Sequence, residues 1–409
     1  MEIFLTQILY LFRPILSTEL VDWALLGFGF FDLAAILLFL LVFVAFSLKL
    51  LHKAREPVSS IEVWAVLFVV WTTISYLVHI DLSSDAAYAK LVIPPLTYIL
   101  LKRILPDRAT HVRMLFLMLV GFLLPFFQSA ALTFQGEGVD QVVYWTGTER
   151  YKGVYANIHS MAHNAGFAMM LGSVYLVLRR CQRVPLRWVE LAVVATAFIV
   201  GLYLLYATQT RSVYVGVAAF FVTFLFFYSK RALALFIALA IAFLAYFWES
   251  ISVIFFDFLD PRGAGFEIEK AGSGRLAMWT RVWDQWIDSP FLNQLTGMGV
   301  TIPGGPKGGP AAIWAKFRPW GDPHNDWLFV IMSLGLIGFG ILVGLFASIL
   351  RAVLRLRGEE KFAMLALFAA VVLMNLITNS YITRFSMFQM FFMVIVYADL
   401  RPARNPQKT

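Results

Sequence analysis

The chain has 409 residues, of which 60% are hydrophobic and 14% are charged, with a formal net charge of +8. Soluble globular proteins carry about 25% charged residues, so this composition and a mean hydropathy of +0.76 exclude an ordinary soluble enzyme. The basic residues are scattered between apolar segments, which favours membrane topology over nucleic-acid binding as the cause of the positive charge. The single cysteine, Cys181, excludes an intrachain disulfide.

Apolar runs of about 20 residues recur along the chain, and each is long enough to cross a bilayer as an α-helix. The sequence therefore predicts an all-α, polytopic membrane bundle of about 11–12 transmembrane helices with a large extracytoplasmic loop that contains helices. Residues 3–20 form either a twelfth span or an interfacial helix. The expected spans are 23–47, 61–80, 88–104, 114–134, 157–178, 188–207, 212–229, 231–248, 326–350, 362–379 and 383–399.

Alternate loops between these spans hold about 20 of the 33 lysines and arginines. Because cytoplasmic loops carry an excess of Lys and Arg, these loops are expected in the cytoplasm. They are 49–55, 102–113, 179–187, 229–231, 351–361 and 401–409.

The expected organisation has three regions. Residues 1–248 form an N-terminal transmembrane bundle, and residues 326–409 form C-terminal transmembrane helices and a cytoplasmic tail. Residues 249–325 form a periplasmic loop with an amphipathic helix and a Gly/Pro-rich segment at 302–310. A loop of this length between closely spaced spans is more often functional than idle.

Cations on the outer side depart from this charge rule and are therefore informative. Cations at the ends of spans commonly reach lipid headgroups, and this alternative stays open for Lys90, Arg211 and Arg384. Arg211 is the strongest candidate, because it follows Thr210 at the expected start of a helix. A guanidinium, hydroxyls and helix N-terminal amides together suit a phosphate oxygen. Lys90 either makes a second anion contact or pairs with a nearby aspartate.

The long outer loop supplies further candidates. Its segment 272–300 predicts an amphipathic helix with Arg275 near the start and Arg281 further along. Such a helix rests on the membrane interface or offers its aromatic rings to sugars. Arg281 and Arg318 are taken as substrate-binding candidates. The expected apolar face holds Leu276, Trp279, Trp283, Trp286 and Ile287.

His324 ends this loop beside Asn325, between Asp322 and Asp326. A histidine between carboxylates can be held in one tautomer and accept a proton near neutral pH. The alternative is a structural histidine that caps the span beginning near residue 327.

Three other polar residues of the spans have weaker claims to a function. His159 and His163 have the i, i+4 spacing of metal ligands, but no third ligand suggests itself, so satisfied interfacial histidines are favoured and no metal is expected. Asp32, inside the first firm span, is either a buried partner or a proton site.

Three segments together resemble the O-antigen ligase and polymerase family of bacterial membrane glycosyltransferases. The first, TQTRSVYVG from residue 208, is a hydroxyl-rich turn with Arg211 opening a span. The second, from 274 to 300, resembles the family's order of Arg, Trp, Ile-x-x-x-Pro and Gly-x-Gly, and the third is His324-Asn325 before a Gly-rich span. Two departures are Thr210 in place of the usual Ser and the extra residues 292–296.

The resemblance implies a reaction on lipid-linked glycan at the periplasmic face of the bacterial inner membrane. A glycan on undecaprenyl pyrophosphate would move en bloc to an acceptor hydroxyl, on the lipid A core for a ligase or on another lipid-linked glycan for a polymerase. The enzyme would be a metal-independent, inverting glycosyltransferase without a cofactor. Arg211 and Arg275 would stabilise the diphosphate, His324 would act as base, and Lys90, Thr210, Arg281, Asn325 and Arg318 would bind substrate.

Two alternatives come from other classes of protein. A flippase or transporter of lipid-linked glycan suits the number of spans, although transporters usually place polar features near the bilayer midplane. A non-catalytic scaffold leaves the outer Arg and His residues unexplained. Within the family, the single large outer loop favours a ligase over a polymerase.

Overall fold

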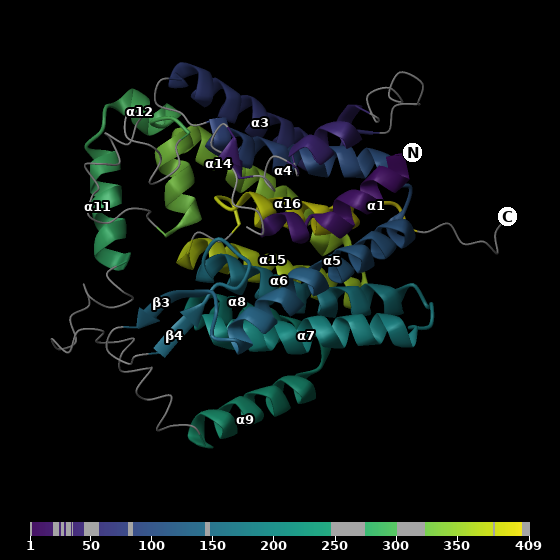
Figure 1. The fold of residues 1–409 in the computed structure, drawn as a ribbon. Helices are drawn as coiled ribbons and strands as arrows, with labels where there is room; N and C mark the ends of the chain where they lie inside the picture. Colours follow the sequence, from purple (N-terminus) through teal and green to yellow (C-terminus); the bar gives the residue numbers. More distant parts are fainter. Residues whose placement is uncertain are drawn as a thin grey trace.

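The computed structural model is an almost entirely helical bundle whose long helices lie side by side (Figure 1). The model describes residues 2–18, 24–25, 28–29, 34, 36–44, 57–80, 85–143, 148–246, 275–300, 324–378 and 381–402. Two small antiparallel hairpins, β1–β2 and β3–β4, are the only sheets among these residues. The predicted all-α polytopic class is confirmed.

The helices are α1 (Glu2–Phe12), α3 (Ser60–Val78), α4 (Asp85–Ile104), α5 (Arg108–Phe134), α6 (Ile158–Cys181), α7 (Trp188–Thr208), α8 (Arg211–Tyr228), α9 (Lys230–Tyr246), α11 (Arg275–Ile287), α12 (Phe291–Thr296), α14 (Asp326–Arg355), α15 (Gly358–Ile377) and α16 (Phe385–Ile395). The strands are β1 (Ala24–Leu25), β2 (Phe28–Gly29), β3 (Val139–Val143) and β4 (Thr148–Tyr151). Two 3-10 turns complete the elements, η1 (Ile15–Ser17) and η3 (Val396–Asp399).

Seven helices of the described residues, α3, α5, α6, α7, α8, α14 and α15, are long and apolar enough to cross a membrane. Helices also form at three more expected spans, as α4, α9, and α16 with η3. The expected span 23–47 lies largely outside the described residues. Apolar side chains on the outer faces of the helices stay exposed, including Phe127 and Ile199, as lipid-facing residues do.

The described part of the N-terminal segment, residues 2–18, packs against the bundle. Helix α1 has only 11 residues, about half the length that a span needs. It packs against α5, and Leu9 and Tyr10 are fully buried. The Tyr10 hydroxyl donates to the Met393 carbonyl at 2.8 Å, which ties α1 to α16.

Helix α6 is the most enclosed of the seven long apolar helices, because 83% of the residues in its apolar stretch are buried. It packs on α5, α7, α8 and α15. Close approach is possible because small residues face its neighbours: Gly166 meets Val213 and Val217 of α8, and Gly172 meets Val194 of α7. These neighbouring helices therefore hold the first turn of α6 in a fixed position at one end of the bundle.

Several of the basic loops meet at the end of the bundle opposite the first turn of α6. Arg108 bonds Glu360 at 3.2 Å, and its backbone amide donates to the Arg401 carbonyl. The Gln182 amide donates to the Arg108 carbonyl, and Arg180 lies 3.9 Å from Glu359. Four of the predicted cytoplasmic segments thus share one end of the bundle, as the alternation of basic loops requires. The hairpin β3–β4 and helices α11 and α12 lie at the other end (Figure 1).

Candidate active site

His324 stands immediately before α14 in a left-handed backbone conformation, with φ of 48°. Such a φ is uncommon for a residue with a side chain and needs support from its surroundings. Asn325, and not His324, is the cap of α14: its Oδ1 accepts from the backbone amides of Trp327 and Leu328 at 3.0 and 3.1 Å. The Asn325 amide also donates to the Leu376 carbonyl at 3.0 Å. His324 is therefore not the residue that caps α14.

Asp326, the next residue, organises the segment between α15 and α16. It is fully buried, and its carboxylate accepts from the backbone amides of Tyr381, Ile382 and Thr383 and from the Thr383 hydroxyl at 2.6 Å. A carboxylate that receives this many donors fixes the backbone that supplies them. Asp326 therefore sets the position of the residue that follows this segment, Arg384.

Arg384 and His159 bring the start of α6 to His324. The Arg384 guanidinium donates to the Ser160 hydroxyl at 2.6 Å. The imidazole rings of His159 and His324 lie 6.4 Å apart, centroid to centroid. The side chain of His324 therefore faces the first turn of α6.

Arg275 begins α11, and its guanidinium donates to the Ile377 carbonyl at 2.7 Å, near the C-terminal end of α15. The end of α12 is inserted into a kink of α14 at Gly335, whose φ is 67°. There the Met298 amide donates to the Met332 carbonyl at 2.9 Å, and Trp71 Nε1 donates to the Leu334 carbonyl at 2.9 Å. These bonds satisfy carbonyls that the kink leaves without a helical partner, and they fix the end of α12 and helix α3 against α14.

The kink also explains the Gly-x-Gly motif. Gly297 has φ of 85°, and a Cβ on it would overlap the Ser333 backbone, while a Cβ on Gly335 would overlap the Leu295 carbonyl. The extra residues 292–296 form most of the short helix α12, so this departure from the family pattern is accommodated before the motif.

Arg211 begins α8, as predicted, and Arg150 of β4 holds the turn before it. Arg150 Nε donates to the Thr208 carbonyl at 2.8 Å, and its NH2 group donates to the Gln209 carbonyl at 3.3 Å and lies 3.5 Å from the Thr210 hydroxyl. Gln209 adopts a left-handed φ of 50°, which reverses the chain between α7 and α8. Burial and the neighbouring Arg211 guanidinium lower the pKa of Arg150.

These groups converge on His159. Arg384, Arg150, His324 and Arg275 all interact electrostatically with it, and Arg211 interacts with Arg150. The six residues, Arg150, His159, Arg211, Arg275, His324 and Arg384, are called the cationic cluster below. Four guanidinium groups from four different segments favour an anion with several oxygens, and an imidazole beside them can accept a proton. Among the described residues, no group of His, Cys, Asp or Glu side chains has the arrangement of a metal site.

The other predicted site residues occupy varied positions. Thr210 is buried as the residue before α8, and Lys90 is half-buried on the first turns of α4. Arg281 is exposed on α11, and Asn325 is engaged as the helix cap. Arg318 and Asp322, together with Asp32 and the segment 302–310, lie outside the described residues.

The predicted helix at 272–300 forms as α11, but its packed face differs from the expected one. Met278, Val282 and Trp286 are buried, whereas Leu276, Trp283 and Ile287 are 41–50% exposed. The helix packs on α14 through one side, which leaves other apolar side chains outward. An outward apolar side at the end of the bundle is the arrangement of an interfacial helix.

Three members of the cationic cluster are not predicted as site residues by the sequence. In the sequence, Arg384 is an outer cation, His159 has the features of an ordinary interfacial histidine, and Arg150 lies in a loop of intermediate length. The signal that could have found both arginines is the one that selected Arg211, a cation on the outer side of the charge pattern. Nothing in the local sequence indicates that His159 meets His324.

The fold and the cluster define a polytopic helical membrane protein with a cationic, histidine-containing site at one end of its bundle. Residues 196–343 match the sequence model of the O-antigen ligase family, so this segment, which runs from α7 into α14, belongs to that family. The family carries out O-antigen ligase- or polymerase-type reactions of lipopolysaccharide biosynthesis in a membrane, with lipid-linked glycan. No curated protein matches the chain.

Proposed function

We propose that the protein is a ligase-type glycosyltransferase that moves a glycan en bloc from undecaprenyl pyrophosphate to a sugar hydroxyl of the lipid A core. The reaction would take place at the periplasmic face of the bacterial inner membrane, without a metal and with inversion at the anomeric carbon. The observation that carries the proposal is that His324 and three arginines, Arg150, Arg275 and Arg384, lie near His159, with Arg211 beside Arg150. Both the expected base and the expected diphosphate ligands belong to this one cluster.

The arginines would act on the leaving group. When the bond between the anomeric carbon and the diphosphate oxygen breaks, its electron pair moves to undecaprenyl pyrophosphate, which gains negative charge. Arg211 and Arg275 would stabilise that charge, with Arg150 and Arg384 beside them. Charges fixed in place before the reaction commonly supply the largest catalytic contribution. The bonds of Arg150 to the turn and of Arg275 to Ile377 provide such fixation.

His324 would act on the acceptor. The acceptor oxygen forms its bond to the anomeric carbon and loses its proton to the imidazole. A general base in this position contributes about 10²- to 10⁴-fold in rate. Base and diphosphate on opposite sides of the anomeric carbon would give inversion. Asn325 and Asp326 would be positioning residues, because they fix the backbone on either side of the cluster.

The test is glycan transfer in a strain that lacks its own ligase. We expect His324→Ala and Arg211→Ala to lower transfer at least 100-fold at normal protein abundance. Arg231→Ala, at the opposite end of the bundle, is the matched control and should retain activity. Full transfer by either site variant contradicts the assignment of residues. Capped lipopolysaccharide in this strain supports a ligase, whereas restored glycan chain length in a second strain, which lacks its own polymerase, supports a polymerase.

A further inference from the structure

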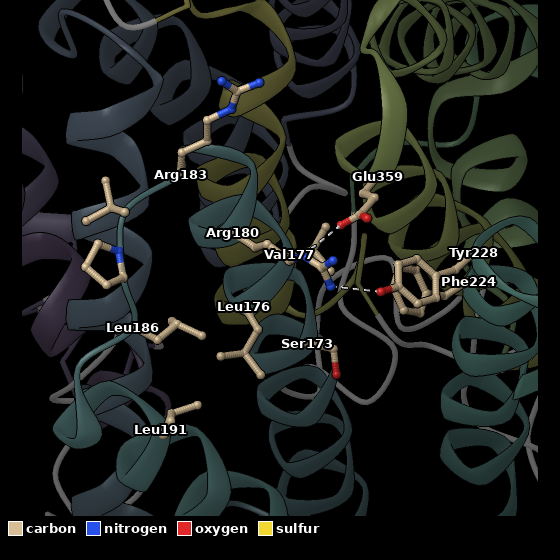
Figure 2. A pocket seen from close by; sticks show the side chains of 12 residues that line it. Ser173, Leu176, Val177, Arg180, Arg183, Leu186, Leu191, Phe224, Tyr228 and Glu359 are labelled. Carbon is tan, nitrogen blue, oxygen red and sulfur yellow. Dashed lines mark hydrogen bonds and ion pairs between the residues drawn. The ribbon is translucent and has the colours of Figure 1, made fainter.

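A cavity of about 770 Å³ lies at the end of the bundle opposite the cationic cluster. Figure 2 shows the side chains that line it. It is formed by the last turns of α6, the segment 182–187, the start of α7, the end of α8 and Glu359 at the start of α15. None of the residues to which catalysis is assigned contributes to it. Its position among basic loops is the predicted cytoplasmic side.

The walls of the cavity are apolar and belong to membrane-spanning helices. Leu176 and Val177 come from α6, Leu191 from α7 and Phe224 from α8. Leu191 is 47% exposed and Leu186 is 36% exposed, so the cavity opens to the outside of the bundle. In a membrane this outside is hydrocarbon, and an acyl chain is the molecule that such walls accommodate.

The edge of the cavity carries basic side chains. Arg180 donates to the Tyr228 hydroxyl at 3.0 Å and lies 3.9 Å from Glu359, and Figure 2 shows both contacts. The ion pair is long, and the Arg180 side chain is 67% exposed, so the pair adds little and the guanidinium can turn to another anion. Arg183 points away from Leu186 and Leu191 in the same view. Two arginines against one glutamate leave the lining with a positive balance.

We propose that this cavity binds one anionic phospholipid of the leaflet at the basic end of the bundle. Arg180 and Arg183 would bind the phosphate, and an acyl chain would lie along Leu176 and Leu191. Basic pockets between transmembrane helices on the cytoplasmic side bind anionic headgroups in this way. The adjacent Arg179 bonds Glu190 at 3.2 Å and holds α6 to α7, so the walls keep their spacing whether or not lipid is bound.

The experiment uses the full chain, purified in detergent, with phosphatidylglycerol or phosphatidylcholine added before native mass spectrometry. We expect one phosphatidylglycerol to bind in preference to phosphatidylcholine. Arg180→Ala/Arg183→Ala should weaken phosphatidylglycerol binding about tenfold and leave phosphatidylcholine unchanged. Arg187→Ala removes a cation from the same segment without touching the cavity and should change neither.

Two further measurements separate the headgroup from the chain. Leu191→Trp should narrow the cavity and weaken phosphatidylglycerol binding while both arginines remain. Glycerol phosphate, which has no acyl chain, should not compete. Unchanged phosphatidylglycerol binding by the double variant, competition by glycerol phosphate, or displacement of phosphatidylglycerol by equimolar polyprenyl phosphate would each overturn the proposal.

Discussion

The imidazole rings of His159 and His324 face one another at 6.4 Å between centroids, with 51° between their planes. One histidine belongs to the first turn of α6 and the other precedes the cap of α14, so the contact joins segments that are far apart in the sequence. Around this pair lie Arg150, Arg275 and Arg384. The histidine pair thus lies where guanidinium groups from separate segments come together.

The first prediction concerns the charge at His159. His159→Glu places a carboxylate among the guanidinium groups, where it competes with a diphosphate for the same donors. We expect glycan transfer to fall at least 100-fold while the protein stays folded. His159→Phe keeps an uncharged ring and should retain activity within about tenfold. Equal activity of the Glu and Phe variants would contradict an anion site at the cluster.

The second prediction concerns the turn before α8. Arg150→Ala removes the bonds to the carbonyls of Thr208 and Gln209. Hydrogen bonds from charged groups contribute about 1.5–3 kcal/mol, so we expect a stability loss of about 2 kcal/mol together with reduced transfer. Thermal unfolding in detergent and the transfer assay measure the two effects. Lys152→Ala, just after the same strand, should leave both unchanged, and loss of activity there would deny Arg150 a specific role.

The third prediction concerns the kink of α14. Gly335→Ala puts a Cβ against the Leu295 carbonyl at a φ of 67°, and we expect a loss of about 2–4 kcal/mol with displacement of α12. Gly340→Ala, five residues later in the same helix, meets nothing within 4 Å and should be neutral or stabilising by up to about 1 kcal/mol. Thermal unfolding of the two variants compares them directly. Equal stability would mean that the kink is not required.

The fourth prediction concerns Asp326. Asp326→Ala leaves the buried backbone amides of the segment 381–383 with fewer acceptors, although the Tyr381 amide keeps Asn375 Oδ1 at 3.1 Å. Each lost acceptor costs about 1–3 kcal/mol, so we expect destabilisation by about 3 kcal/mol or more. Transfer should fall as well, because Arg384 follows this segment. The exposed Asp284→Ala is the control, and it should shift stability by less than about 0.5 kcal/mol.

The expected helices agree with the structure because the length of an apolar run can be read from the sequence of that run alone. A run of about 20 apolar residues must form its backbone hydrogen bonds within itself, whatever its neighbours are. The alternation of basic loops likewise predicted which helix ends meet, and Arg108, Gln182 and Arg401 do meet. The packed face of α11 was not predictable in this way, because it depends on where α14 lies.

The sequence by itself determined the class of protein and the positions of most helices, and it predicted that Arg211, Arg275 and His324 lie at the end of the bundle opposite the basic loops. Only the tertiary structure decided that His159, Arg150 and Arg384 join them, and that Asn325 rather than His324 caps α14. The physical reason is that charge and hydropathy act along the chain, whereas a site arises where helix ends from distant segments are packed together. That packing rests on the close approach of α6 to its neighbours and on the insertion of Gly297 into the kink of α14.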